Sequence, residues 1–239
     1  SISGAKVFMG RKDYYRLSQD ISSYQKFFGR IRDYLTYWGF REDMVERFFR
    51  SFNRQYYNAD LDISSITFVD GDIKSSEFEV IYTPGHTNGS ICIYHREMGL
   101  LFTGDTLMKK IVSVPIIEHS DNHITSMLTE HIKSLKKLKE IKCSYVLPGH
   151  GDIISMEDEV IDTIFTYIKR RANRVESLLR EGHDNVYSLA IALYGRDVFF
   201  DVVHKEEPTV YISDLMMPIE YLYQQNHIRV EDGRIKILI

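Results

Sequence analysis

The sequence predicts a layered α/β domain followed by a small, mostly helical domain. Segments typical of strands alternate with segments typical of helices up to about residue 157, a pattern that favours layers of helix and sheet. Short glycine-containing turns that carry His or Asp follow several of these strands directly. After Met156 the pattern changes to three helices and a hairpin. We therefore expect one domain over residues 1–157 and a second over residues 158–239.

Hydrophobic periodicity predicts the elements of the first domain. Apolar residues three and four apart indicate a helical, aromatic-rich insertion at about 13–58, with a helix stop at Gly39. Another helix is expected over 124–141, and His131 falls on its apolar side. Strand-like runs occur at 5–9, 66–69, 78–82, 90–94, 100–102 and 144–147.

The aromatic-rich insertion allows two interpretations. Its apolar face could pack on the core, as amphipathic helices ordinarily do. Alternatively, the insertion could be a lid whose aromatic side chains border a substrate pocket or the partner subunit of a homodimer. The sequence alone leaves both open.

The second domain is predicted to be a winged helix. Helices are predicted over 157–180, 186–194 and 209–225, the last of them beginning or kinked near Pro218. The pair Asp232-Gly233 lies between two strand-like runs and is typical of a hairpin turn. Three helices followed by a two-stranded wing is the element order of winged-helix domains.

Composition narrows the class of protein. The 239 residues carry a formal net charge of −4, which gives no general attraction to nucleic acid or to an acidic membrane surface. No apolar run approaches the roughly 20 residues that span a bilayer. Cys92 and Cys143 lie inside apolar runs, as small core residues do in a reducing compartment. We therefore expect a cytoplasmic protein with no membrane segment.

Three turns carry side chains that suit metal chemistry. His86 lies in a Pro-Gly turn, Asp105 in a Gly turn, and His150 in a second Pro-Gly turn, each after a predicted strand. Imidazole nitrogens and carboxylate oxygens are ligands of zinc and similar ions, and turns at successive strand ends can converge on one point. The two oxygens of Asp105 could bridge two ions, which would make hydroxide available near neutral pH.

The segments TPGHTNGS, LFTGDT and VLPGHG resemble the last three metal motifs of the metallo-β-lactamase superfamily, in the same order. The resemblance extends to KSLKKL before the third motif and to YIKRRANRVESLL with its winged-helix-like tail. It implies an αββα sandwich that binds two divalent metal ions, zinc in the first place, with iron or manganese as alternatives. His86 would bind the first ion, Asp105 would bridge, and His150 would bind the second.

The sequence departs from the family at one motif. The His-x-His-x-Asp-His motif that supplies the remaining ligands is absent, and the run at 119–123, HSDNH, has a different spacing and follows Asp105. The chain thus resembles a member without its N-terminal part, which would also hold the catalytic base. We expect no complete two-metal site in these residues alone, although one weakly bound ion is compatible with them.

The resemblance implies a hydrolase in which metal-bound hydroxide attacks a small ester or thioester substrate, as in hydroxyacylglutathione-hydrolase-like enzymes. A nuclease or phosphodiesterase is an alternative, because some members with such tails act on nucleic acid. Residues 169–239 hold ten Lys and Arg against eleven Asp and Glu, a balance that argues against strong phosphate binding. The third possibility is a non-catalytic scaffold with an incomplete metal site.

Overall fold

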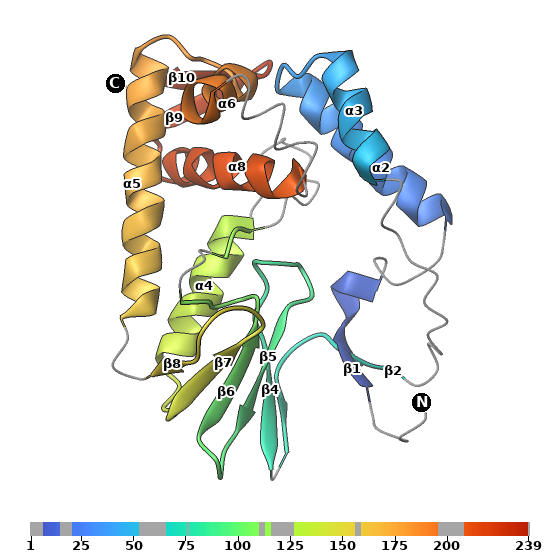
Figure 1. Cartoon of the computed structure of the whole chain (residues 1–239), viewed down its shortest axis with the longest axis vertical. Helices are drawn as coiled ribbons and strands as arrows, with labels where there is room; N and C mark the ends of the chain where they lie inside the picture. The colour runs from blue at the N-terminus through green and yellow to red at the C-terminus, as the bar shows by residue number, and fades with distance from the viewer. Residues whose placement is uncertain are drawn as a thin grey trace. The chain divides into compact units, whose positions relative to one another are not determined.

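The computed structural model describes residues 7–14, 21–52, 66–75, 77–109, 113–115, 127–155, 159–195 and 208–238. They form two compact units, coloured along the chain in Figure 1, which are described here one at a time. The first unit is built around a β-sheet. The second consists of helices and a terminal hairpin.

The main sheet of the first unit has six strands in the order in which they occur in the chain, from β3 to β8. Neighbours are antiparallel except β6 and β7, which are parallel, so β4, β6 and β7 run in the same direction. Their carboxyl ends consequently meet at one edge of the sheet. The strands are β3 (Ile73–Lys74), β4 (Phe78–Tyr82), β5 (Ile91–His95), β6 (Leu100–Gly104), β7 (Tyr145–Pro148) and β8 (Ile154–Ser155).

Helix α4 (Met127–Lys139) lies against one face of this sheet (Figure 1). Its apolar side is buried at helical spacing, including Leu128, Leu135 and Leu138, while its lysines point to solvent. Lys137 on the exposed side reaches the edge of the sheet, where its Nζ lies 2.6 Å from an oxygen of Asp72. The ammonium group and the backbone N–H of Tyr82 outweigh the effect of burial and lower the pKa of Asp72.

The opposite face of the sheet is apolar; it is exposed on β5 and β6 but buried at Val80 of β4, which pairs with Ile93. Ile93 of β5 pairs with Phe102 of β6, and both lie on this face, where they are 37% and 45% exposed. Tyr145 of β7 is also exposed, whereas its neighbour Val146 points to the buried side. Buried and exposed residues alternate along β6, as in strands with one face to solvent, whereas Val80 and Ile81 of β4 are both buried.

A second, two-stranded parallel sheet completes the first unit. It pairs β1 (Val7–Gly10) with β2 (Ile66–Val69), and β1 leads into the short 3-10 helix η1 (Arg11–Asp13). The ring of Phe8 in β1 packs edge-on against Phe78 of β4, with centroids 6.3 Å apart.

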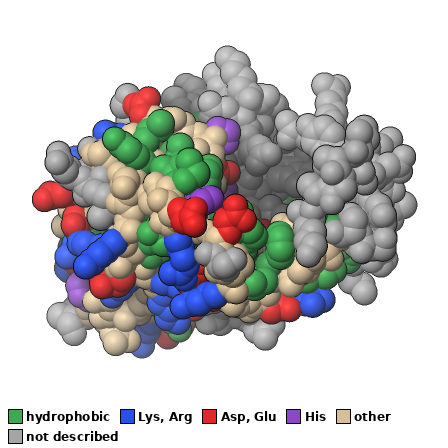
Figure 2. Space-filling view, turned by 90° about the horizontal axis from the view of Figure 1, so that it is seen from below, with side chains coloured by type: hydrophobic (Ala, Val, Ile, Leu, Met, Phe, Trp, Pro, Cys, Tyr) green, Lys and Arg blue, Asp and Glu red, His purple; other side chains and the backbone are tan. Residues whose placement is uncertain are grey.

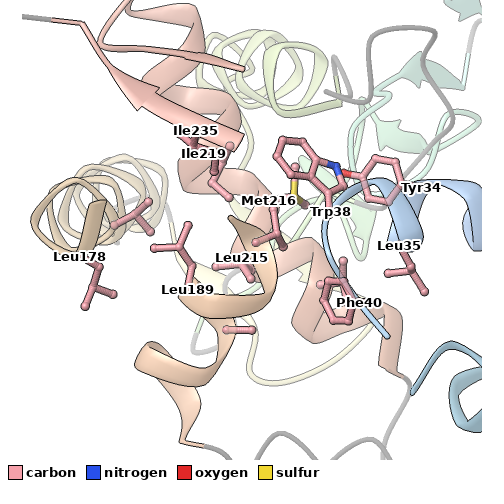
Figure 3. Packing of buried hydrophobic residues seen from close by; sticks show 14 of the residues in the cluster. Tyr34, Leu35, Trp38, Phe40, Leu178, Leu189, Leu215, Met216, Ile219 and Ile235 are labelled. Carbon is pink, nitrogen blue, oxygen red and sulfur yellow. The ribbon is translucent and has the colours of Figure 1, made fainter. Parts of the chain in front are cut away.

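The second unit has a single hydrophobic core (Figure 3). Trp38, Leu189 and Ile219 are fully buried in it, and Trp38 makes edge contacts with the rings of Tyr34 and Tyr37. The contributing elements are α2 (Ile21–Tyr37), α3 (Glu42–Phe52), α5 (Val160–Arg180), α6 (Val186–Tyr194), α8 (Pro208–Gln224), β9 (Ile228–Glu231) and β10 (Arg234–Ile237). Of the helices described, none combines the length and apolar character needed to cross a membrane.

The structure bears on several expectations from the sequence. The apolar face of the aromatic-rich helices is packed into a core, but this core belongs to the second unit and not to the sheet. Pro218 lies inside α8, so the helix does not begin there. The predicted boundary between residues 157 and 158, the winged-helix assignment and the homodimer stay predictions.

Candidate metal centre

The three turns that carry the candidate metal ligands lie at the same edge of the main sheet. Strand β4 ends at Tyr82 and leads to His86, β6 ends at Gly104 directly before Asp105, and β7 ends at Pro148 shortly before His150. Because these strands are parallel to one another, their following turns meet. The carboxyl ends of strands are the usual place for a binding site in an open α/β sheet.

Asp105 lies between the two histidines. The Nε2 atom of His86 is 3.8 Å from Oδ2 of Asp105, and the Nε2 atom of His150 is 3.7 Å from Oδ1. Two ligands of one zinc ion, each at about 2.2 Å, are at most about 4.4 Å apart. Both nitrogen–oxygen separations therefore fit a cation held between the two atoms, and each carboxylate oxygen serves a different histidine.

The donors that the structure describes are divided between two positions. Each position has one imidazole nitrogen and one carboxylate oxygen, and the described part of the chain contains no group of three or more His, Cys, Asp or Glu placed to hold one ion. The alternative HSDNH run at 119–123 lies outside the described residues. The structure thus brings together His86, Asp105 and His150, while their role as ligands stays a prediction.

A neighbouring carbonyl orients the ring of His86. Its Nδ1 atom lies 3.2 Å from the carbonyl oxygen of Val114 and 3.4 Å from the hydroxyl of Ser113. A carbonyl can only accept a hydrogen bond, so Nδ1 is the donor in this bond, and Nε2 is the ring nitrogen that faces Asp105. Metal-binding histidines are commonly fixed in this way by a bond from the other ring nitrogen.

A glycine allows the carboxylate of Asp105 to fit beside the third turn. The N–H of Gly149 donates to the carbonyl of Gly104 at 2.7 Å and ties the two turns together. A Cβ atom on Gly149 would lie only 2.6 Å from Oδ1 of Asp105. Glycine at this position thus gives the carboxylate the space it needs next to His150.

Buried hydroxyl groups connect the first two turns beneath the site. The hydroxyl of Thr83 lies 3.2 Å from the sulfur of Cys92 and 3.4 Å from the hydroxyl of Thr106, and all three side chains are buried. Burial raises the pKa of the Cys92 thiol to about 11, so it stays protonated at neutral pH. Cys92 is therefore a packing residue, in agreement with the prediction from sequence.

His131 is a buried histidine close to the site, on the apolar side of the helix, where the sequence predicted it. It lies on α4 with no exposed surface, and neither ring nitrogen has a hydrogen-bond partner within the described structure. Burial, with a smaller contribution from His86, lowers its pKa to about 3, which keeps the ring neutral. In the sequence, its position among Met and Leu residues on the apolar side of the predicted helix could have indicated that it is buried.

The backbone of α4 lies directly against the turn that holds His86. Gly85 has a φ angle of +148°, and a Cβ atom there would be 2.5 Å from the Cα atom of His131. The hydroxyl of Ser134, one turn further along α4, donates to the carbonyl of Pro84 at 2.7 Å. Helix α4 thus fixes the position of the first ligand turn.

Comparison with known proteins identifies the family of the chain. The sequence profile of the metallo-beta-lactamase superfamily matches residues 4–150. The beta-lactamase-like protein 2 homolog of Drosophila melanogaster is 29% identical over 139 residues, which are 56% of this chain and 40% of that protein. The atrochrysone carboxyl ACP thioesterase of Aspergillus fumigatus is 28% identical over 117 residues, which are 48% of this chain and 34% of that protein.

A solved structure shares the fold. A metallo-beta-lactamase family protein from Thermus thermophilus superposes with a TM-score of 0.70 and 18% identity, covering 98% of this chain and 72% of that one. The predicted α/β fold class is thereby confirmed. The chain spans 40% or less of the two curated relatives named above. Since the family profile matches more than half of its residues, the chain belongs to the metallo-beta-lactamase superfamily.

Proposed function

We propose that the protein is a metal-dependent hydrolase that acts on a small ester or thioester. The observation that carries the proposal is the meeting of His86, Asp105 and His150 at one sheet edge, with each oxygen of Asp105 facing a different imidazole. Neutral imidazole and carboxylate donors are suited to zinc, and equally to iron or manganese.

The chain's own residues would hold and orient the reacting groups. His86 and His150 would each donate Nε2, and Asp105 would bridge through its two oxygens. Divalent ions bound there would lower the pKa of a water molecule and polarise the carbonyl that it attacks. The side chain of His150 is 71% exposed, so a substrate could reach this side of the site from solvent.

The relatives favour an acyl substrate. Three of them are described as thioesterases, two from Aspergillus fumigatus and one from Emericella nidulans. In such a reaction water attacks the acyl carbon, the carbon–sulfur or carbon–oxygen bond breaks, and the thiol or alcohol leaves with a proton. We infer the same class of reaction here.

The proposal requires further ligands. One nitrogen and one oxygen at each position are fewer than the three protein donors typical of a catalytic zinc site. The missing donors would come from residues beyond those described or beyond these 239 residues. The test is therefore best made on the complete protein, purified with its metal.

The deciding experiment combines metal analysis with a thioester assay. The triple variant His86→Ala/Asp105→Ala/His150→Ala should lose the bound metal and the hydrolysis of an acyl thioester. His95→Ala is the matched control, because His95 pairs with Glu77 on the same sheet, on a strand that carries no ligand. A triple variant that keeps its metal would exclude these residues as ligands, and a metal-free wild-type protein would favour the scaffold alternative.

A further inference from the structure

The turn that holds His86 is bound by a carboxylate from a distant part of the chain. Asp13, the last residue of η1, accepts a hydrogen bond from the hydroxyl of Thr87 through Oδ2. Its other oxygen, Oδ1, accepts the N–H of Gly89 at 3.0 Å. One carboxylate thus contacts both the residue that follows His86 and the end of the turn.

The two segments approach each other at backbone distance. A Cβ atom on Gly10 would lie 1.9 Å from the carbonyl oxygen of Gly89, and a Cβ atom on Gly89 would lie 2.7 Å from Cγ of Asp13. Contacts this short leave no room for a side chain between the segments. The position of the Asp13 carboxylate over the turn is therefore set by the backbone and does not depend on a long, flexible side chain.

Hydrogen bonds within the turn connect this contact to His86. The N–H of Gly85 donates to the carbonyl of Thr87 at 2.9 Å, and the hydroxyls of Thr87 and Ser90 are 2.7 Å apart. His86 lies between Gly85 and Thr87, so a fixed Thr87 limits where its ring can point. With α4 packed against Gly85, the turn is held on both sides.

We propose that Asp13 is a positioning residue that holds the His86 turn in the geometry required for metal binding. We call the contact of Asp13 with Thr87 and Gly89 the clamp. The clamp is a contact within the chain, and the inference rests on the proposed function only for the consequence of the clamp, a higher metal affinity. Without Asp13, two buried or half-buried donors would lose their acceptor and the turn would have to be ordered when the ion binds. Loss of such a supporting partner typically lowers metal affinity about 10- to 100-fold.

The variants separate the clamp from general effects of substitution. Asp13→Asn keeps the size of the side chain but presents an NH2 group to one of the two donors, and Thr87→Val removes one of those donors. Thr87→Ser keeps the hydroxyl and should behave as wild type. Asp70→Asn is the matched carboxylate control, because Asp70 pairs with the exposed Arg11 beside the same segment and does not contact the turn.

Two measurements on the complete protein test the inference. The first is amide hydrogen exchange at Gly85 and Gly89 in the metal-free protein, and the second is a Co²⁺ titration followed by visible absorption. We expect Asp13→Asn and Thr87→Val to exchange faster at these amides and to bind Co²⁺ about 10-fold more weakly or worse. Because Asp13 and Thr87 contact each other, the loss of Co²⁺ affinity in the double variant should be smaller than the sum of the two single losses.

The possible results distinguish the clamp from the metal hydrolase. Unchanged exchange in Asp13→Asn would overturn the clamp, whatever the metal affinity. Faster exchange with unaltered Co²⁺ affinity and spectrum would show that Asp13 stabilises the turn but does not position His86 for metal binding, and would also overturn the inference. If the wild-type protein binds no ion but amide exchange still depends on Asp13, then Asp13 does restrain the turn and the proposed metal-dependent hydrolase is wrong.

Discussion

At the scale of single residues, the site depends on groups that are not themselves candidate ligands. His131 is the clearest case, because a fully buried polar ring without a partner among the described residues costs stability. The ring is tolerated because it is neutral, and burial lowers its pKa to about 3. A hydrophobic side chain would fill the same place without this sensitivity to acid.

We predict that His131 makes the fold sensitive to acid. Its pKa is about 3 in the folded protein against 6.5 ordinarily, so the unfolded chain binds the proton first and acid favours unfolding. The stability contribution is complete above about pH 6.5 and should fall by up to ~1.4 kcal/mol per pH unit between about pH 6 and pH 3. Urea unfolding of His131→Leu and wild type across this range measures the difference, and parallel pH profiles would contradict it.

A second residue-scale prediction concerns Gly149. In Gly149→Ala the methyl group would meet Oδ1 of Asp105 at 2.6 Å, so the carboxylate must turn away from His150. Overpacking of this kind costs about 1–3 kcal/mol, and metal affinity should fall by about 10-fold, the size of a typical supporting-group effect. Equilibrium dialysis with Zn²⁺ measures it. Gly71→Ala is the control, because a Cβ atom there meets nothing within 4 Å, and equal affinities in the two variants would refute the steric argument.

At the scale of elements, the second unit is tied together by a half-buried polar cluster on three helices. Asp214 of α8 accepts hydrogen bonds from Arg171 of α5, from Tyr194 of α6, and from the hydroxyl of Tyr167 at 3.0 Å. Burial, followed by the charge of Asp214, raises the pKa of Tyr167 to about 12 and that of Tyr194 further, so both hydroxyls stay protonated donors. The cluster thus links α5, α6 and α8.

We expect Asp214→Asn to destabilise the second unit by about 2–4 kcal/mol, because it leaves the guanidinium of Arg171 buried without its counter-charge. Glu176→Gln offers a comparison, since it weakens the surface pairs with Arg180 and His227 and should cost about 1 kcal/mol or less. Denaturant unfolding followed by circular dichroism reports both values. Similar losses of stability in the two variants would show that the half-buried Asp214 cluster stabilises the protein no more than a surface ion pair does.

At the scale of the whole molecule, charge argues against a nucleic-acid ligand. The formal net charge is −4, and on the face seen in Figure 2 basic and acidic side chains lie next to one another among hydrophobic ones. Two arginines of α5 are already paired, Arg171 with Asp214 and Arg180 with Glu176. Lys169, Arg170 and Arg174 of the same helix are exposed, so the expectation of weak nucleic-acid binding rests on the overall balance of charge.

The protein should therefore not bind duplex DNA through a basic surface. Fluorescence polarisation with a labelled duplex is expected to show weak binding with little dependence on salt between about 50 and 200 mM. A steep decrease in affinity over this range would indicate several phosphate contacts. That outcome would revive the nuclease alternative.

The sequence alone determined the local structure and the three candidate ligands. Strands β2 and β4 lie where strand-like runs predicted them, at Ile66–Val69 and Phe78–Tyr82, because β-branched and aromatic residues favour strands. His86, Asp105 and His150 were identifiable because each stands in a glycine turn directly after a strand. The two-residue strands β3 and β8 were missed, since so short a segment has no periodicity to read.

Only the tertiary structure decided which distant segments meet. Periodicity shows that a helix has an apolar face but does not identify the surface it packs against, so the grouping of α2 and α3 with the C-terminal helices could not be predicted. The same holds for Asp13, whose contacts lie 74 and 76 residues away in the chain, and for His131, which meets Gly85 across the helix–sheet interface. Such contacts depend on how helices and sheet pack together in the folded protein, and no local sequence pattern specifies that packing.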